Sequence, residues 1–356
     1  MRISDATCYK FTLPLQEPLE LEGHTVYRRR GLLLRLTGED GAVGWGEAAP
    51  LPGFSAESVD EAAEALSVRA RSLRDRSLSE DSQPLFQRPA SEVPPSVRFA
   101  VQSAVVEARA DRAGTSVGAL LGDGRDPVSL NALVPVGATD LTARGERLRQ
   151  AGFQAVKLKV GRSDPARDAE RVRALHSGLG EAVALRLDAN RAWSLDEAAA
   201  FAEAIASVPI EYVEEPLARP DRLPDFAGQT GLPVALDETT RERPPEILAD
   251  LGDIAAVVLK PTLLGGLVIA RRWTREATSV GAATVLSSSY ESGVGTRMLL
   301  ALASVWADAP VGLSAHMRLS ADVLRPRLQL GGPTVSAEAG GESRVDLSRL
   351  SRVETT

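Results

Sequence analysis

The chain has 356 residues, 44% of them hydrophobic and 25% charged, and a formal net charge of −7 at pH 7. This length exceeds one ordinary domain, so we expect one large barrel with additions or two packed domains. The net negative charge does not favour binding to nucleic acid. No apolar run approaches the roughly 18 residues that are needed to cross a bilayer. A single cysteine excludes an internal disulfide, and Met1 to Lys10 lacks a secretory pattern, so we expect a cytoplasmic protein.

The first 125 residues predict an α+β unit. Thr25 to Leu36 and Ala42 to Glu47 are rich in strand formers, which favours a small antiparallel meander. Helical periodicity follows at Ser58 to Ser72 and at Val97 to Ala113, and we expect the polar stretch 78–95 between them to be a loop. The only dense basic run, residues 28–30, is interpreted as a solvated face.

From Val128 onward, short aliphatic or β-branched runs alternate with amphipathic stretches of 10 to 15 residues. The helices expected between the strands include 164–176, 195–207 and 263–280. Eight candidate strands follow one another at a steady interval of twenty-odd residues, and this pattern predicts a TIM-like α/β barrel over residues 126–320. The candidate strands end near Val136, Lys159, Asp188, Glu214, Leu236, Lys260, Ser287 and Leu313. The last segment, 321–356, leaves this rhythm, and we expect it to pack back on the N-terminal unit of residues 1–125.

Lysine is scarce in this chain. Of the 41 basic residues only four are lysines, namely Lys10, Lys157, Lys159 and Lys260. Arginine stays protonated in proteins, whereas lysine can lose its proton. This sequence uses arginine almost wherever it needs a positive charge, yet keeps lysine at positions 157, 159 and 260, which indicates proton transfer there.

Five ionisable residues lie at the ends of predicted strands: Lys159, Asp188, Glu214, Asp237 and Lys260. The intervals between them are 29, 26, 23 and 23 residues, about one βα unit each, so the side chains should circle one barrel mouth. Three carboxylates gathered there repel one another unless a cation neutralises them. Oxygen ligation suits a hard ion, and we therefore expect Mg²⁺.

Lys157 and Lys159 are two residues apart on one strand, so both should point to the same face. A second ammonium and a divalent cation nearby would favour the neutral form of Lys159, which suits a general base. Lys260 comes from the other side of the ring. A substrate carboxylate bound to the metal would then lie between two lysines, and removal of the proton next to it would form a stabilised enediolate.

Longer segments carry a family resemblance. They are 44–55 (GWGEAAPLPGFS), 187–193 (LDANRAW), 258–266 (VLKPTLLGG) and 287–295 (SSSYESGVG), together with the K-x-K at 157–159. In these the chain resembles the enolase superfamily, in its muconate-lactonizing subgroup, and within that subgroup the o-succinylbenzoate synthases. The resemblance implies a (β/α)7β barrel capped by the N-terminal unit, with the loop from Leu15 to Thr25 as a mobile lid.

The resemblance also implies an activity: Mg²⁺-dependent dehydration of 2-succinyl-6-hydroxy-2,4-cyclohexadiene-1-carboxylate to 2-succinylbenzoate in menaquinone biosynthesis. In this scheme Lys159 is the base that then protonates the departing hydroxyl, and Lys260 is a cation that holds the enediolate. The implied metal ligands are Asp188, Glu214 and Asp237, with Mn²⁺ able to replace Mg²⁺. The implied substrate contacts are Lys157, Arg186, Asn190, Ser287 and Gly312. For Arg186, a salt bridge within the protein is as good an interpretation as contact with the substrate.

Two acidic neighbours, Glu215 and Glu238, could be mistaken for ligands. Because strand alternation aims neighbouring side chains at opposite faces, only one of each pair should face the mouth, and the family pattern favours Glu214 and Asp237. Histidine is nearly absent, and His316 could line the mouth.

Other activities compete with this interpretation. An N-succinylamino acid racemase, or a bifunctional enzyme, would use the same two lysines as bases on opposite faces of one carbon. Dipeptide epimerases carry an Asp-x-Asp near the last strand, where this chain has 312–316 (GLSAH), and sugar-acid dehydratases use a late histidine. An inactive metal-binding scaffold would be expected to lose some of the five groups, and a Schiff-base aldolase needs no carboxylate triad. The sequence predicts a small carboxylate as partner and leaves the oligomeric state open.

Overall fold

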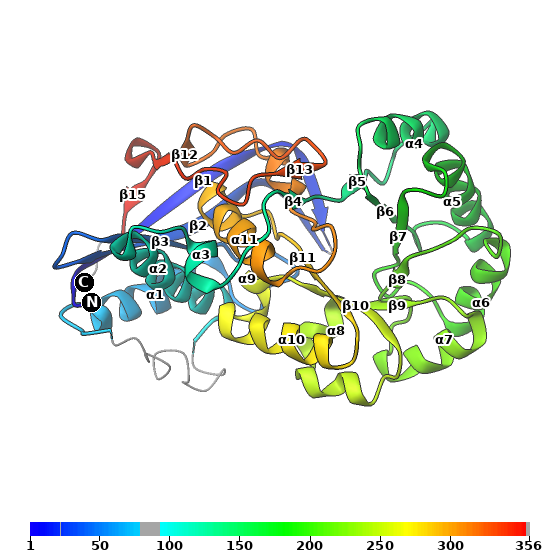
Figure 1. Cartoon of the computed structure of the whole chain (residues 1–356), viewed down its shortest axis with the longest axis horizontal. Coiled ribbons are helices and arrows are strands. Elements are labelled where there is room, and N and C mark those ends of the chain that lie inside the picture. Colours follow the sequence, from blue (N-terminus) through cyan, green and yellow to red (C-terminus); the bar gives the residue numbers. More distant parts are fainter. Residues whose placement is uncertain (22, 79–92, 354–356) are drawn as a thin grey trace.

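Residues 1–21, 23–78 and 93–353 are described by the computed structural model. Figure 1 shows an N-terminal unit built around a long antiparallel sheet beside a ring of strands and helices. The expected loop at 78–95 lies largely outside the described residues. Within the described part of the chain, no helix is long and apolar enough to cross a membrane.

The N-terminal sheet has the strand order β15-β1-β2-β3. Its strands are β1 (Ile3–Leu21), β2 (His24–Gly38), β3 (Val43–Ala48) and β15 (Ser351–Arg352). Helices α1 (Val59–Leu73) and α2 (Pro95–Ala113) cover one face of this sheet around an apolar core. Helix α2 approaches β3 so closely that a Cβ added at Gly46 would lie 1.8 Å from the carbonyl oxygen of Ala100. Glycine is therefore required at this crossing.

The segment expected to be a mobile loop, Leu15 to Thr25, is largely a β-hairpin. Strands β1 and β2 continue to pair beyond an irregularity between Pro14 and Leu19, with Leu19 opposite Val26 and Leu21 opposite His24. The expectation of a loop was therefore wrong, because the irregularity accommodates the proline-containing stretch and pairing resumes after it.

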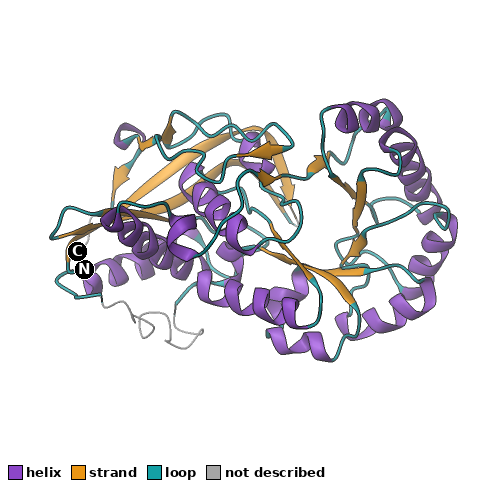
Figure 2. Cartoon of the chain, in the orientation of Figure 1, coloured by secondary structure: helices purple, strands orange, loops and turns teal. Residues whose placement is uncertain are grey.

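The barrel contains a seven-stranded parallel sheet in the order β11-β10-β9-β8-β7-β6-β5. Isolated bridges close the ring at the eighth position, where Gly312 pairs with Ser287 and Val311 pairs with Leu130. Figure 2 shows strands inside and helices outside. The strands are β5 (Ala132–Val134), β6 (Ala155–Lys159), β7 (Ala184–Asp188), β8 (Tyr212–Glu214), β9 (Val234–Leu236), β10 (Ile254–Leu259) and β11 (Ala283–Leu286). This arrangement confirms the predicted TIM-like barrel with an α+β capping unit.

The helices of the barrel connect successive strands and bury their apolar sides against them. They are α4 (Leu141–Gln150), α5 (Pro165–Leu179), α6 (Leu195–Ala204), α7 (Leu223–Thr230), α8 (Glu238–Glu242), α9 (Pro261–Leu264), α10 (Leu267–Ser279) and α11 (Gly293–Trp306). The shorter elements are α3 (Val117–Leu121), β4 (Val128–Ser129), η3 (Pro220–Arg222), η4 (Pro245–Ala249), η5 (Ser314–Arg318), β12 (Leu324–Arg325), β13 (Thr334–Val335), β14 (Arg344–Val345) and η6 (Leu347–Arg349).

One expected helix, 263–280, is in fact two. Gly265 and Gly266 have φ of 100° and 104°, which separates α9 from α10. Side chains of α2 occupy the break, because Gln102 accepts a hydrogen bond from the backbone N–H of Leu267 at 2.5 Å and a Cβ at Gly265 would collide with Arg98. The single-helix prediction failed because the periodicity continues across two residues whose conformation only glycine adopts readily.

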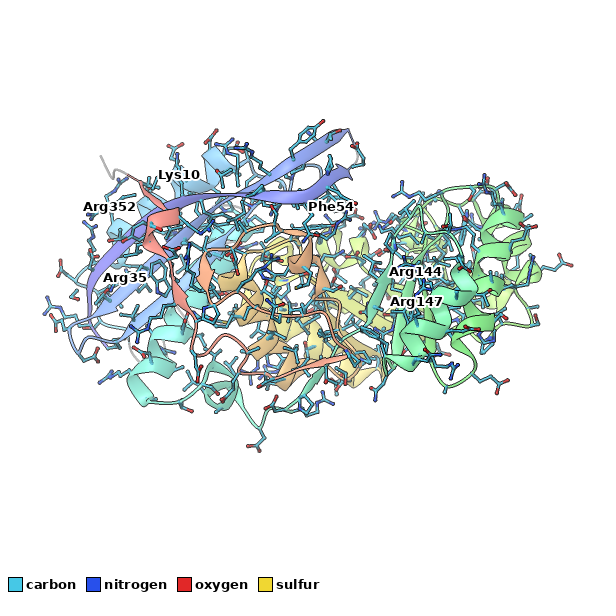
Figure 3. The ribbon with its side chains drawn as sticks, turned by 90° about the horizontal axis from the view of Figure 1, so that it is seen from above. Lys10, Arg35, Phe54, Arg144, Arg147 and Arg352 are labelled. Carbon is cyan, nitrogen blue, oxygen red and sulfur yellow. The ribbon has the colours of Figure 1, made fainter. Side chains whose placement is uncertain are left out.

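The C-terminal segment contacts the capping unit. Strand β15 pairs antiparallel with β1, with Arg352 opposite Tyr9, and Figure 3 shows Arg352 beside Lys10. An apolar cluster also joins Leu319 and Val323 to the sheet side chains Phe11 and Leu13. The exact boundaries at 125/126 and 320/321 stay predictions.

Candidate active site at the barrel mouth

A cavity of about 140 Å³ lies where the C-terminal ends of the barrel strands meet the capping unit. Its capping side is apolar and consists of Leu21, Leu51 and Phe54. Figure 3 places Phe54 at this junction. The barrel side contributes Asn131, Leu133, Lys157, Lys159, Asp188, Asn190, Asp237, Lys260, Leu263, Ser287, Ser288, Ser289, Tyr290, Gly312, Ser314 and Ala315. A partly open, mostly apolar cavity with charged side chains on its barrel side suits a small organic acid.

Lys157 lies between two of the predicted metal ligands. Its Nζ is 2.7 and 2.8 Å from the two carboxylate oxygens of Glu214 and 2.9 Å from Oδ2 of Asp188. Burial alone would lower the pKa of Lys157, but these carboxylates outweigh it and raise the pKa well above its usual value. For Asp188, burial acts to raise the pKa, and Lys157 and Lys159 more than offset it, so its pKa is lowered.

Lys159 is the first member of a polar chain. Its Nζ donates to Oδ1 of Asn190 at 2.6 Å and lies 3.6 Å from Oδ2 of Asp188. The Asn190 amide donates in turn to Glu238 at 3.2 Å. Asn190 has a φ of 44°, in the left-handed region, and its backbone N–H donates to Asp188. The sharp bend after β7 therefore places the amide of Asn190 against Lys159.

Lys260 follows β10, four strands around the ring from Lys159, and forms an ion pair with Oδ2 of Asp237. Asp237 is 2% exposed, and its other oxygen, Oδ1, is buried without a partner among the described residues. Burial acts to raise the pKa of Asp237, and Lys260 overrides it, so the carboxylate stays charged. A charged, buried oxygen without a partner is the kind of group that a cation would satisfy.

The two acidic neighbours behave differently from each other. Glu215 turns away from the mouth and accepts hydrogen bonds from the backbone N–H groups of Asp237 and Thr239 and from Arg191. Glu238 accepts a hydrogen bond from the amide of Asn190, a residue that lines the cavity. Glu238 is itself absent from the lining residues, and the choice of Glu214 and Asp237 over their neighbours stays a prediction.

The fit of a metal ion to the three predicted carboxylate ligands depends on their arrangement and on their donor atoms. Among the described residues, no three His, Cys, Asp or Glu side chains are arranged to hold one as they stand, because Lys157 lies between Asp188 and Glu214. The donor chemistry nonetheless fits: the three side chains offer only oxygens, all are buried, and Oδ1 of Asp237 has no partner. Burial and the charge of Asp188 raise the pKa of Glu214 well above its usual value, because Lys157 lowers this pKa by less than they raise it.

Arg186 does not line the cavity. It is 0% exposed, and its guanidinium binds the carboxylate of Glu211 at 2.5 Å and the carbonyl oxygen of Pro310 at 2.6 Å. It also lies over the ring of Tyr212 at 5.2 Å. These contacts favour the salt bridge over substrate binding as the role of Arg186.

Replacing Arg186 with methionine is therefore expected to lower the free energy of unfolding by about 3 kcal/mol, because it leaves Glu211 and the carbonyl of Pro310 without their cation. Urea denaturation measures this loss, and KM should stay within about twofold of wild type. Arg222→Met, which breaks an exposed pair with Asp225, is the control and should cost under about 0.5 kcal/mol. A large rise in KM with unchanged stability would place Arg186 at the substrate.

The loop after β11 carries more of the cavity wall than expected. Ser287 and Gly312, the predicted substrate contacts of this region, line the cavity together with Ser288, Ser289 and Tyr290. The hydroxyl of Ser289 is buried and has no partner among the described residues. The prediction took in the segment that begins at Ser287 but named only that residue, because no spacing rule indicates which residues of a loop turn inward. His316 is absent from the lining residues and lies buried 3.5 Å from Asp322.

Comparison with known proteins identifies a family for most of the chain. A family model described as "Enolase C-terminal domain-like" matches residues 140–340, and one described as "MenC, N-terminal domain" matches residues 3–108. The chain is 33% identical to the o-succinylbenzoate synthase of Edwardsiella ictaluri (strain 93-146) over 348 residues, which cover 96% of this chain and 98% of that protein.

Solved structures give the same fold. The L-Ala-D/L-Glu epimerase from Bacillus subtilis, in a substrate-liganded complex, superposes with a TM-score of 0.83 at 26% identity and covers 94% of this chain and 96% of that one. The dipeptide epimerase from Cytophaga hutchinsonii, complexed with Mg and the dipeptide D-Ala-L-Val, superposes with a TM-score of 0.84 at 23% identity and 99% coverage of both chains. The chain belongs to the enolase superfamily and, within it, to the o-succinylbenzoate synthase family.

Proposed function

We propose that this site dehydrates 2-succinyl-6-hydroxy-2,4-cyclohexadiene-1-carboxylate to 2-succinylbenzoate, as a hydro-lyase on the cytoplasmic route to menaquinone. The observation that carries the proposal is the pair of lysines, Lys159 and Lys260, which face one cavity from opposite sides of the ring over three buried carboxylates. Family membership makes dehydration the leading reaction for such a pair.

Asp188, Glu214 and Asp237 would hold Mg²⁺, and Mn²⁺ would substitute because it also accepts oxygen ligands. The bound ion supplies positive charge for the substrate carboxylate and for the negative charge that develops on it. Lys157 contacts oxygens of two of these ligands, so its ammonium and the ion compete for them. Lys157 thereby limits the repulsion between the carboxylates before the ion binds.

Lys159 removes the proton from the ring carbon that bears the carboxylate, and the C–H electron pair enters the enediolate. The same ammonium then gives the proton to the hydroxyl leaving from the same face, so one C–H and one C–O bond break, water departs, and the ring becomes aromatic. Lys260, on the opposite side, stabilises the negative charge of the enediolate as a fixed cation. Asn190 holds the Nζ of Lys159 at 2.6 Å and orients it.

An N-succinylamino acid racemase is the second candidate, because it needs the same two lysines. We would follow the loss of the cyclohexadiene's ultraviolet absorbance with Mg²⁺ present, beside polarimetry on N-succinyl amino acids. The expected result is rapid dehydration with little or no racemisation. Racemisation alone would overturn the synthase assignment and keep the site, and dehydration together with racemisation at similar rates would define a bifunctional enzyme.

A further inference from the structure

Arg29 of β2 is a buried cation whose contacts are unusual. It is 1% exposed, although its neighbours Arg28 and Arg30 are exposed as a solvated face predicts. Burial lowers the pKa of Arg29, while the charges of Glu291 and Glu47 act in the opposite direction. Its hydrogen bonds in the described structure all end on backbone carbonyls. Burying a guanidinium is costly, so contacts made only to backbone indicate a role in fixing geometry.

The carbonyls that Arg29 binds belong to two loops far apart in sequence. In the capping loop, Nη2 donates to Ala49 at 2.8 Å and Nη1 donates to Pro50 at 2.9 Å. In the barrel loop after β11, Nε donates to Tyr290 at 3.1 Å and Nη2 donates to Ser289 at 3.3 Å. One planar guanidinium therefore holds both loops at once.

Both loops line the cavity. The capping loop continues into Leu51 and Phe54, and the barrel loop contributes Ser289 and Tyr290 themselves. Tyr290 has a φ of 63°, a conformation that costs free energy for a residue with a side chain. Its carbonyl oxygen is the one that Nε of Arg29 binds, so the guanidinium stabilises this bend.

We infer that Arg29 is a positioning residue that sets the distance between the capping loop and the barrel loop across the cavity. Neither loop carries a lysine or a predicted metal ligand, so these loops would contact the part of the substrate remote from the reacting carboxylate. Arg29 thus governs recognition of the succinyl side chain without touching it. This inference rests on the proposed function.

Lysine cannot replace arginine here. The four hydrogen bonds need donors spread over a plane, which a guanidinium provides and a single ammonium does not. Arg29→Lys keeps the positive charge and loses the planar set of hydrogen-bond donors, and Arg29→Met loses both the charge and the donors. Arg28→Lys and Arg28→Met are matched controls on the same strand, because Arg28 is exposed.

The test compares two competitive inhibitors, 2-succinylbenzoate and benzoate, which share the carboxylate and differ by the succinyl side chain. Arg29→Lys is expected to raise the inhibition constant of 2-succinylbenzoate about tenfold, a loss of about 1.4 kcal/mol of binding free energy, because the loops that contact its side chain are displaced, and to leave the inhibition constant of benzoate within about twofold. Thermal unfolding confirms that each variant is folded. If Arg29→Met does not fold, Arg29→Lys decides the question.

Equal loss for both inhibitors, or no loss for either, would overturn the inference. Failure of the proposed function is distinguishable, because wild type would then not dehydrate the cyclohexadiene. The Arg28 variants should match wild type for both inhibitors, and a selective loss in them would also count against a specific role for Arg29.

Discussion

Lys159→Ala is expected to lower kcat/KM for dehydration by at least about 10⁴-fold, the upper range for a general acid–base group, because the same side chain removes the proton and returns it to the leaving hydroxyl. Lys159 lines the cavity with its Nζ 2.6 Å from Asn190 and 3.6 Å from Asp188, whereas the ammonium of Lys157 is bound by Glu214 and Asp188. The absorbance assay measures the rate, and binding of 2-succinylbenzoate to the variant shows whether the cavity persists. Lys10→Ala, at an exposed position on β1, is the control and should leave the rate unchanged.

Arginine substitutions separate the roles of the two lysines. Lys159→Arg should be as inactive as Lys159→Ala, because arginine does not release its proton. Lys260→Arg keeps a fixed cation near Asp237 and should retain about tenfold more activity than Lys260→Ala, since an electrostatic role needs charge and not proton loss. The result would instead indicate two bases, and hence a racemase, under two conditions. Lys260→Arg and Lys260→Ala would be equally inactive, and each lysine would separately catalyse exchange of the substrate hydrogen.

Removal of the metal is the second large effect that we expect. Chelation of Mg²⁺ should lower kcat by at least about 10³-fold, because a metal contributes several kcal/mol to stabilising charge in the transition state, and added Mg²⁺ should restore the rate. Asp237→Asn should weaken Mg²⁺ binding, since it removes the charge of the carboxylate whose Oδ1 is buried without a partner in the described structure.

Stability gives a readout of this binding that is independent of turnover. A ligand at 100 times its Kd stabilises the folded state by about 2.7 kcal/mol, so Mg²⁺ should raise the Tm of wild type and have much less effect on Asp237→Asn. The comparison uses the Mg²⁺-dependent shift because the substitution also leaves Lys260 without its ion-pair partner. Glu246→Gln, in an exposed pair with Arg272, should keep the full shift. An undiminished shift in Asp237→Asn would remove that residue from the metal site.

Much of the barrel could be predicted because its strands end in polar residues. Lys159, Asp188 and Glu214 are the last residues of their strands in the structure, at the predicted positions. The apolar run before each one defines the strand, and the charged residue marks its end at the mouth. Five groups at intervals of one βα unit therefore converge, and the structure brings all five together.

What could not be predicted depends on contacts between distant backbone segments. Arg29 looked like part of a solvated run, and its burial follows from carbonyls 20 and more than 200 residues away, which leave no pattern in the sequence. The hydrogen bond from Asn190 to Glu238 depends on a bend after Leu236 that strand alternation does not describe. The break at Gly265 and Gly266 depends on side chains of α2.

The pairing of β15 with β1 has a consequence for how the protein is made. Tyr9 and its partner Arg352 are 343 positions apart, and Leu15 of the same strand bridges to Leu319. As the chain leaves the ribosome, the outer edge of β1 therefore stays unpaired while the whole barrel is synthesised. An unpaired strand edge is a template for association with other chains. The capping sheet is thus begun first and completed last, and nascent chains that stop within the barrel would be the ones most exposed to aggregation.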